Sequence, residues 1–336
     1  MKIGNFDLNK DILIVAEIGN NHEGSFALAK KMIHLAKEAG AGAVKFQAIV
    51  PDRLVSIRQK QRIRQLEKFR LSNKEFEQLS RVARREGLLF LSTPFDAVTV
   101  HSLAPLVAAF KIASGDNDFF PLINVIARTG KPIILSTGLA DIKQILKTVD
   151  FIQNIWRQSE IKQEIALLHC VTSYPVRPEE ANLLAIRTLG RQFNATVGYS
   201  DHTLGIDACV LAAALGARII EKHFTIDNNY SDFHDHKISA DHKDFALLVR
   251  RVREAEKMLG DGVKRLQDSE KTLLKAVRRS IVAKRKLSKG TVLNLNDLDW
   301  VRADKGLVWG QEGKILGKTL VRPVQRGESI ALGDVY

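Results

Sequence analysis

Several classes of protein are disfavoured by what this sequence lacks. Its 336 residues include only two cysteines, Cys170 and Cys209, and both lie inside apolar segments. A disulfide framework is therefore not expected, and a reducing cytoplasm is the simplest setting. No apolar run reaches the roughly 20 residues that a membrane helix needs. The first residues, MKIGNFDLNK, also lack the apolar core of a signal peptide. We therefore expect no association with a membrane.

The usual signatures of nucleotide and nucleic-acid binding are also missing. No G-x-G-x-x-G follows the first apolar run, and no G-x-x-x-x-G-K-[ST] occurs anywhere. The net charge is +13, from 51 Lys and Arg against 38 Asp and Glu. Much of the positive charge lies in segments 53–70 and 250–286, which carry no interleaved aromatics and no recognisable nucleic-acid module. We interpret both segments mainly as solvated helix faces and expect no nucleic-acid partner.

Eight short apolar runs recur along the first 260 residues, each followed by a loop and a helix-like segment. They are ILIVAEIG (12–19), AVKFQAI (43–49), LLFLSTPF (88–95), AAFKIASGD (108–116), PIILSTG (132–138), IALLHCVTSY (165–174), ATVGYSDH (195–202) and RIIEKHF (218–224). Segments 25–40 and 72–87 are amphipathic, and Ser72 with Glu75 forms a capping box at the start of the second. Strands that alternate with helices form a parallel sheet, so eight units predict a (β/α)8 TIM barrel.

The pattern changes after about residue 260. Segment 261–280 is polar and linker-like, with helical potential, whereas segment 281–336 alternates short strand-like runs with glycine turns. We therefore predict a barrel domain over 1–260, a linker over 261–280 and a separate small β-rich domain over 281–336. The last is near the lower size limit for folding alone.

Polar residues cluster at the end of nearly every apolar run. In a TIM barrel the carboxyl ends of the strands build the active site, while the rest of each strand packs the core. One polar strand end carries little information, but eight in register predict a site. The clusters are Glu17; Lys45 and Gln47; Ser92 and Thr93; Lys111 and Ser114; Ser136 and Thr137; Thr172, Ser173 and Tyr174; Ser200, Asp201 and His202; and Glu221, Lys222 and His223.

Two histidines are candidate metal ligands. His202 and His223 end the seventh and eighth runs, which are neighbours in the predicted barrel. Two converging imidazoles suit a divalent transition ion such as Mn, Fe, Co or Zn, with oxygen or water ligands completing the shell. The alternative is that each is a hydrogen-bonded histidine without a metal.

Two lysines make a candidate anion site. Lys45 and Lys111, with the hydroxyls of Thr93, Ser114 and Ser136, form a cationic, donor-rich floor that suits phosphate and carboxylate groups. One alternative is a Schiff base between a buried lysine and a carbonyl substrate. Another is that the lysines extend to solvent.

Glu17 and the segment FHDHKIS (233–239) complete the candidate site. A lone acid on a buried strand pairs with a lysine or acts as a general acid or base, and Glu17 could do both. Segment 233–239 places His234, Asp235 and His236 in the loop after the eighth run. It is either a solvated turn or a part of the site.

The motifs are recognisable when taken together. IVAEIGNNHEGS, AVKFQ, FLSTPFD, FKIASGD, PIILSTG, LLHCVTSYP, GYSDHT and IEKHFT, in this order, resemble the sialic acid synthase family. Segment 281–336 resembles its C-terminal antifreeze-like (SAF, β-clip) domain, so the resemblance spans almost the whole chain. It implies condensation of phosphoenolpyruvate with an N-acylated amino sugar, such as N-acetylmannosamine, to give a nonulosonic acid and phosphate.

The resemblance also implies a role for individual residues. His202 and His223 would bind a divalent metal, usually manganese, with magnesium or cobalt as alternatives. Glu17 and Asp235 would be catalytic. The sugar would be faced by Gln47, Tyr174, Asp235 and Arg302, with Arg302 reaching the partner subunit of a domain-swapped homodimer. Phosphoenolpyruvate would lie on Lys45, Thr93, Lys111, Ser114, Ser136, Thr172 and Ser200.

Three departures from the family pattern bear on the choice of substrate. Thr172 replaces an asparagine that contacts phosphate, and residues 233–236 read Phe-His-Asp-His in place of Gly-Pro-Asp-His. Segment 51–71 is basic and lacks an obvious asparagine for the acyl group of the sugar.

Two other function classes stay open. One is a metal-independent Schiff-base aldolase using Lys45 or Lys111. The other is a non-catalytic binding protein, which the intact set of strand-end polar groups argues against.

Overall fold

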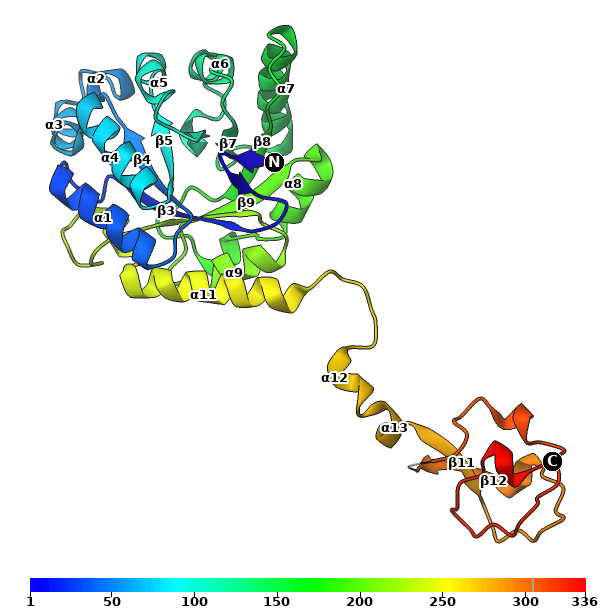
Figure 1. The fold of residues 1–336 in the computed structure, drawn as a ribbon. Coiled ribbons are helices and arrows are strands. Elements are labelled where there is room, and N and C mark those ends of the chain that lie inside the picture. The colour runs from blue at the N-terminus through cyan, green and yellow to red at the C-terminus, as the bar shows by residue number, and fades with distance from the viewer. Residues whose placement is uncertain (304) are drawn as a thin grey trace. The chain divides into compact units, whose positions relative to one another are not determined.

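The computed structural model describes residues 1–303 and 305–336. Contacts divide the chain into two compact units, Met1–Gly260 and Asp261–Tyr336, which are described separately (Figure 1). In the part of the chain that is described, no helix combines the length and apolarity needed to cross a membrane.

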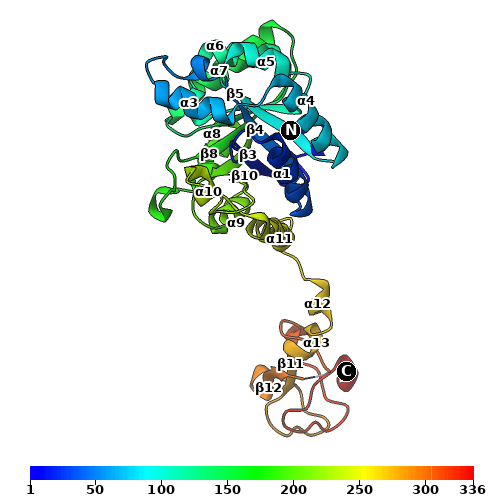
Figure 2. The same ribbon diagram turned by 90° about the vertical axis from the view of Figure 1, so that its left-hand side faces the viewer.

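The first unit is a closed barrel of eight parallel strands, so the predicted TIM barrel is confirmed (Figures 1 and 2). Each apolar run supplies one strand, and neighbours in the chain are neighbours in the barrel. β10 pairs with β3 and closes the ring. The strands are β3 (Leu13–Gly19), β4 (Ala43–Ala48), β5 (Leu89–Pro94), β6 (Ala109–Ile112), β7 (Ile133–Ser136), β8 (Ile165–Cys170), β9 (Thr196–Asp201) and β10 (Ile219–His223).

Helices surround the barrel (Figure 2). Their ends follow capping rules: Ser25 accepts a hydrogen bond from the backbone of Leu28, and Ser72 and Glu75 form the predicted capping box. The helices are α1 (Phe26–Glu38), α2 (Pro51–Leu54), α3 (Lys60–Phe69), α4 (Asn73–Arg85), α5 (Ala97–Leu103), α6 (Phe120–Arg128), α7 (Ile142–Gln158), α8 (Ala185–Phe193), α9 (Asp207–Ala214), α10 (His234–Ile238) and α11 (His242–Leu259).

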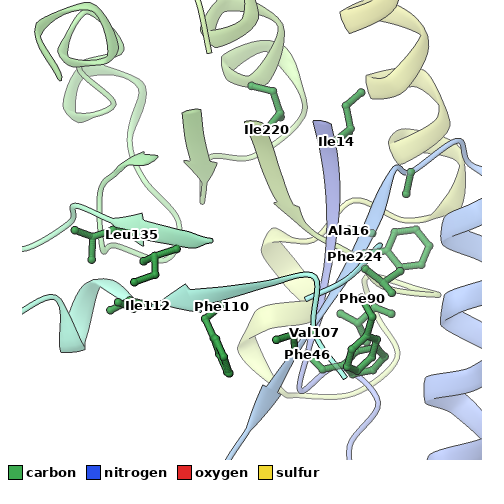
Figure 3. Close-up of a cluster of buried hydrophobic side chains, with 14 of the residues drawn as sticks. Ile14, Ala16, Phe46, Phe90, Val107, Phe110, Ile112, Leu135, Ile220 and Phe224 are labelled. Carbon is green, nitrogen blue, oxygen red and sulfur yellow. The ribbon is translucent and has the colours of Figure 1, made fainter. Parts of the chain in front are cut away.

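The main core lies between the strands and these helices. Outward-facing strand residues such as Ile14, Phe46 and Phe110 are fully buried there (Figure 3). Phe46 stacks on Phe90 with ring centroids 5.7 Å apart. Burying each such side chain contributes roughly 1.5–3 kcal/mol, so this layer holds the strands in place beneath the site.

Inside the barrel, residue type changes along each strand. Alternate residues point inward, so Leu13 and Val15 precede Glu17 on β3, and Ala43 precedes Lys45 on β4. The lower interior is apolar and packs against Ile3 and Leu8. Ile3 belongs to an N-terminal hairpin of β1 (Lys2–Ile3) and β2 (Phe6–Asp7), and Leu8 directly follows β2. No pattern in the sequence predicts this hairpin. The upper interior carries the charged groups.

The second unit contains two short helices, α12 (Asp268–Lys271) and α13 (Leu274–Val277), followed by an antiparallel pair, β11 (Arg279–Ala283) and β12 (Leu298–Arg302). Short 3-10 turns occur at Leu295–Asp297, Glu312–Lys314 and Leu332–Asp334. The unit has its own core of aliphatic side chains, formed by Ile281, Ala283, Leu287, Leu293, Leu298, Leu307, Ile315, Leu320, Val324, Ile330 and Val335.

Candidate active site

Lys45, on β4, stands in a cluster of buried charges at the carboxyl end of the barrel. Its Nζ lies 2.9 Å from Oε2 of Glu17 on β3 and donates to Oγ1 of Thr93 on β5, at 3.3 Å. Burial opposes the charge of the ammonium group, but Glu17 and Glu221 outweigh this effect and raise the pKa of Lys45. Only 4% of Lys45 is exposed. The alternative that it extends to solvent is therefore wrong.

Lys111, on β6, is the second buried cation and is only 3% exposed. Its Nζ donates to Oγ of Ser136 on β7, at 2.5 Å, and to the carbonyl of Ile112. Burial lowers the pKa of Lys111, with Glu221 acting in the opposite direction. For this lysine also, the extension to solvent is excluded.

Glu221, on β10, links the two lysines. Its Oε1 lies 3.7 Å from Nζ of Lys45 and 3.8 Å from Nζ of Lys111, and accepts a hydrogen bond from Ser200 on β9 at 2.9 Å. Burial would raise the pKa of Glu221, but the two lysines lower it to about 2. The sequence motifs predict no specific role for Glu221. Its position two residues before His223, on the same strand face, was a signal that could have found it.

Glu17 both pairs with a lysine and is suited to carry a proton. Burial and the nearby Glu221 raise the pKa of Glu17, although Lys45 opposes them. Its Oε1 accepts a hydrogen bond from Nε2 of Gln47 at 3.2 Å, and Asn20 in turn donates to Oε1 of Gln47 at 2.9 Å. A carboxyl group with a raised pKa, held in place on both sides, fits the role of a general acid or base.

Two hydroxyl groups meet beside Gly138, after β7. Oγ of Ser114 accepts a hydrogen bond from the Gly138 backbone at 3.1 Å. Thr172 places its Oγ1 nearby, and this atom is buried without a hydrogen-bond partner. A Cβ on Gly138 would lie 2.4 Å from Oγ1 of Thr172 and 2.7 Å from Oγ of Ser114. Only a glycine leaves both hydroxyls free to reach a ligand.

His202 and His223 lie side by side, with ring centroids 5.5 Å apart. Nδ1 of His202 donates to the carbonyl of Val171 at 2.9 Å, which leaves its Nε2 unprotonated in the neutral ring. Burial lowers the pKa of His223 to about 3, so its ring is neutral at ordinary pH. Tyr174 packs on His202 with ring centroids 4.2 Å apart.

The donor set at these histidines fits a divalent metal. Nδ1 of His223 is buried without a hydrogen-bond partner and lies 4.0 Å from Oδ2 of Asp235. In the described part of the chain, no group of three or more His, Cys, Asp or Glu side chains is close enough to hold a metal by itself. Water or substrate oxygens would therefore complete the shell of an ion bound to His202 and His223.

Segment 233–239 is not a solvated turn. Residues His234–Ile238 form α10, in which Asp235 and His236 are buried. Asp235 points toward His223 and is held on its other side by His234, whose Nε2 lies 2.8 Å from Oδ1. His236 contacts Thr225 at 2.7 Å and Glu23 at 3.1 Å, which fixes the helix against the loop after β3.

Arg302 is the one predicted site residue that lies in the second unit. It is exposed and ends β12, where it pairs in register with Arg279. Its expected contact with a sugar stays a prediction.

Cys170 and Cys209 are buried free thiols.

A barrel whose charged groups gather at the carboxyl ends of its strands has the architecture of an enzyme. The NeuB family model matches residues 32–264, and the SAF domain model matches residues 278–335. The chain therefore belongs to the NeuB family and carries a SAF domain, as the resemblance predicted. It is an enzyme of the N-acylneuraminate synthase type.

Individual relatives are similar in sequence to this protein over nearly the whole chain. The chain is 36% identical to N,N'-diacetyllegionaminic acid synthase of Campylobacter jejuni, covering 96% of this chain and 99% of that protein. It is 32% identical to N-acetylneuraminate-9-phosphate synthase of Homo sapiens, covering 94% and 90%. The crystal structure of N-acetylneuraminic acid synthetase from Leptospira borgpetersenii, in complex with citrate, has a TM-score of 0.76 and 36% identity. It covers 82% of this chain and 94% of that one.

Proposed function

We propose that this enzyme condenses phosphoenolpyruvate with an N-acylated amino sugar, giving a nonulosonic acid and phosphate. The names of its relatives support this class of reaction. The observation that carries the proposal is the pair of buried lysines, Lys45 and Lys111, on the strands of a barrel that also carries the adjacent histidines His202 and His223 at its carboxyl end. This arrangement offers cations for a small anion and, next to them, a place to activate a carbonyl group.

Phosphoenolpyruvate carries a phosphate and a carboxylate, and the floor of the site offers donors for both. Lys45 and Lys111 supply buried positive charge, and Ser114 and Thr172 supply hydroxyls that face one another across Gly138. Charge-assisted hydrogen bonds in a site closed to water are about twice as strong as neutral ones. These groups would hold the anion and orient its C3 atom.

The reaction needs one carbon–carbon bond and one carbon–oxygen bond. C3 of phosphoenolpyruvate attacks the aldehyde carbon of the sugar, and the aldehyde oxygen takes a proton to become a hydroxyl. Water then adds to the electron-poor C2 and loses a proton. The new C2 hydroxyl loses its remaining proton and becomes the C2 carbonyl as the bond between C2 and the phosphate oxygen breaks, and the departing phosphate takes up a proton. Glu17, with its raised pKa, is placed to accept or return these protons.

His202 and His223 would hold a divalent metal, with manganese as the first candidate and magnesium or cobalt as alternatives. A metal bound there would act as a Lewis acid on the aldehyde oxygen. Tyr174 and Asp235 border the same space, and Gln47 lies between Glu17 and Asn20. We propose that these three side chains orient the sugar.

The test is release of phosphate from phosphoenolpyruvate across a panel of acylated amino sugars. Excess chelator should abolish turnover, and manganese should restore it. His202→Ala should raise the metal concentration needed, whereas His101→Ala, at an exposed position on α5, should not. If none of the sugars in the panel causes phosphate to be released from phosphoenolpyruvate, the proposed function is contradicted. Full activity in excess chelator would contradict the role of the metal.

A second candidate is a Schiff-base aldolase. Burial lowers the pKa of Lys111, and a neutral amine is what a Schiff base requires. Borohydride trapping with the sugar would attach the substrate covalently to Lys111 or Lys45 if this chemistry operates. The metal-dependent reaction leaves no such adduct.

We also propose a homodimer in the cytoplasm in which Arg302 reaches the sugar site of the other subunit. A guanidinium group suits a polar sugar or a carboxylate. Segment 261–280 contains only two four-residue helices, α12 and α13. At about 1.5 Å per helical residue and 3.3 Å per extended residue, such a segment spans several tens of ångströms. It is long enough to reach a second barrel.

A further inference from the structure

Asp201 and Lys222 are two polar strand ends that have no role in the reaction proposed above. They lie opposite one another where β9 pairs with β10. Each directly precedes a candidate metal ligand, His202 or His223. Because alternate residues of a strand point to opposite sides, the side chains of Asp201 and Lys222 point away from the barrel interior. They lie in the layer between the strands and α9.

The two side chains form a buried ion pair. Nζ of Lys222 lies 2.8 Å from Oδ2 of Asp201, and neither side chain is more than 1% exposed. The outer core around this part of the barrel is otherwise formed by residues such as Ile220 and Phe224. Removing two charges from water is costly, and well-packed apolar residues often replace such a pair without loss of stability. The ion pair therefore indicates a task beyond stability.

The carboxylate of Asp201 is fully occupied by donors. Its Oδ1 accepts hydrogen bonds from the Thr203 backbone at 2.8 Å and from the hydroxyl of Tyr199 at 3.0 Å. Its Oδ2 accepts from Sγ of Cys209 on α9, at 3.3 Å, in addition to Lys222. Burial raises the pKa of Tyr199, so this hydroxyl keeps the proton that it donates. Each carboxylate oxygen thus has two donors, which fix its position.

Lys222 reaches past Asp201 to the residue on the other side of His202. Its Nζ also donates to the backbone carbonyl of Thr203. Thr203 is therefore held at its N–H group by Asp201 and at its carbonyl by Lys222. The carbonyl of His202 itself accepts a hydrogen bond from the backbone of Val176 at 3.0 Å. The backbone that carries His202 is thus fixed on both sides, and one of the groups that fix it belongs to the strand of His223.

We infer that Asp201 and Lys222 are positioning residues that set the geometry of the His202 and His223 imidazoles, and through it the affinity for a divalent metal. Moving the end of β9 relative to β10 would break the ion pair and the contact of Lys222 with Thr203. A metal bound to two histidines and to water or substrate oxygens depends on the placement of both rings, because metal–nitrogen distances vary little. This inference rests on the metal site of the proposed function.

The test titrates the full-length enzyme with manganese alone and follows free manganese by its electron paramagnetic resonance signal. Thermal unfolding without metal is measured in parallel. Lys222→Met leaves the carboxylate of Asp201 buried without its counter-ion, so Tm should fall by roughly 5–10 °C. The Kd for manganese should rise at least about tenfold, as is typical when groups that orient metal ligands are removed.

A double variant separates positioning from stability. Asp201→Asn combined with Lys222→Met leaves no buried charge, so its Tm should return to within about 3 °C of the wild type. Its Kd for manganese should stay about tenfold higher, because no group of β10 then holds the carbonyl of Thr203. Ser80→Ala on α4 is the matched control. It removes a buried hydrogen bond to the carbonyl of Leu106, and should lower Tm by about 2 °C with the Kd unchanged.

The two levels of the proposal fail differently. If manganese does not bind, or binds equally well to His202→Ala, the metal site of the proposed function is wrong and the inference falls with it. If manganese binds through His202 but the double variant binds it within twofold of the wild type, only the positioning role is refuted. A double variant that does not fold would also overturn the inference, because the pair would then be required by the fold itself.

Discussion

Replacing Glu221 by glutamine should destabilise the free enzyme strongly, although it removes no bulk. The amide can keep the contact with Ser200, but the charge that faces Lys45 and Lys111 is lost. Two buried cations then face only Glu17. Removing one member of a buried ion pair costs about 3–5 kcal/mol. For a folded unit of the size of this barrel, that loss lowers Tm by roughly 5–10 °C.

The loss should depend on pH in a defined direction. Burial already lowers the pKa of Lys111, and Glu221 is the charge that most opposes this effect. In the variant the folded-state pKa falls further, while the unfolded chain titrates near the ordinary value of 10.5. The folded state then binds fewer protons than the unfolded state over this window. The stability of Glu221→Gln should therefore rise with pH up to about 10.5, more steeply than that of the wild type.

Thermal unfolding at several pH values, with and without phosphoenolpyruvate, measures both effects. The anion supplies the missing negative charge, so it should raise the Tm of the variant more than that of the wild type. Glu77→Gln on α4 is the matched control, since its side chain is 54% exposed and lies 3.9 Å from Arg81. A loss below about 1 kcal/mol, typical of a surface pair, would refute the reasoning, as would equal pH slopes.

Three further predictions follow from the same site. Lys45→Ala and Lys111→Ala should each reduce kcat/KM for phosphoenolpyruvate by one to two orders of magnitude, because a hydrogen bond to a charged group is worth about 1.5–3 kcal/mol; a change within twofold would show that the lysine is misassigned. Gly138→Ala should raise KM for phosphoenolpyruvate about tenfold, because its Cβ would lie 2.4 Å from Oγ1 of Thr172 and overpacking typically costs about 1–3 kcal/mol; steady-state kinetics with an unchanged KM would contradict this. Finally, mixing inactive Arg302→Ala with inactive Glu17→Ala under subunit exchange should restore activity, because a mixed dimer acting in trans has one intact site. No recovery despite proven exchange would exclude action across subunits.

Much of the barrel could be predicted because its signals are local. Each strand is a short apolar run, and the polar residues at its end mark the open face, so position alone was enough to predict Glu17, Lys45 and His202 as site residues. The hairpin of residues 2–7 was missed. Its strands have two residues each, and they are stable only because Ile3 and Leu8 pack against the bottom of the closed barrel.

Roles that depend on pairing between distant segments could not be predicted. Glu221 was visible as a polar strand end, but its contacts with Lys45 and Lys111 depend on ring closure between β10 and β3. Similarly, the composition of segment 53–70 indicated a solvated helix. The packing of Phe69 on Phe233, which holds α3 against the segment after β10, involves residues that are far apart in the sequence.

The two halves of the barrel interior show that its charges are present for function. The lower half is filled by Leu13, Val15 and Leu91 and needs no charge to be stable. Buried ion pairs add little to stability, and well-packed apolar residues can often replace them without loss. The upper half nevertheless keeps two lysines and two glutamates, balanced in charge. An anion that binds here adds negative charge to a cluster whose charges already cancel. Glu17, whose pKa is raised by burial, is therefore the group best placed to take up a proton.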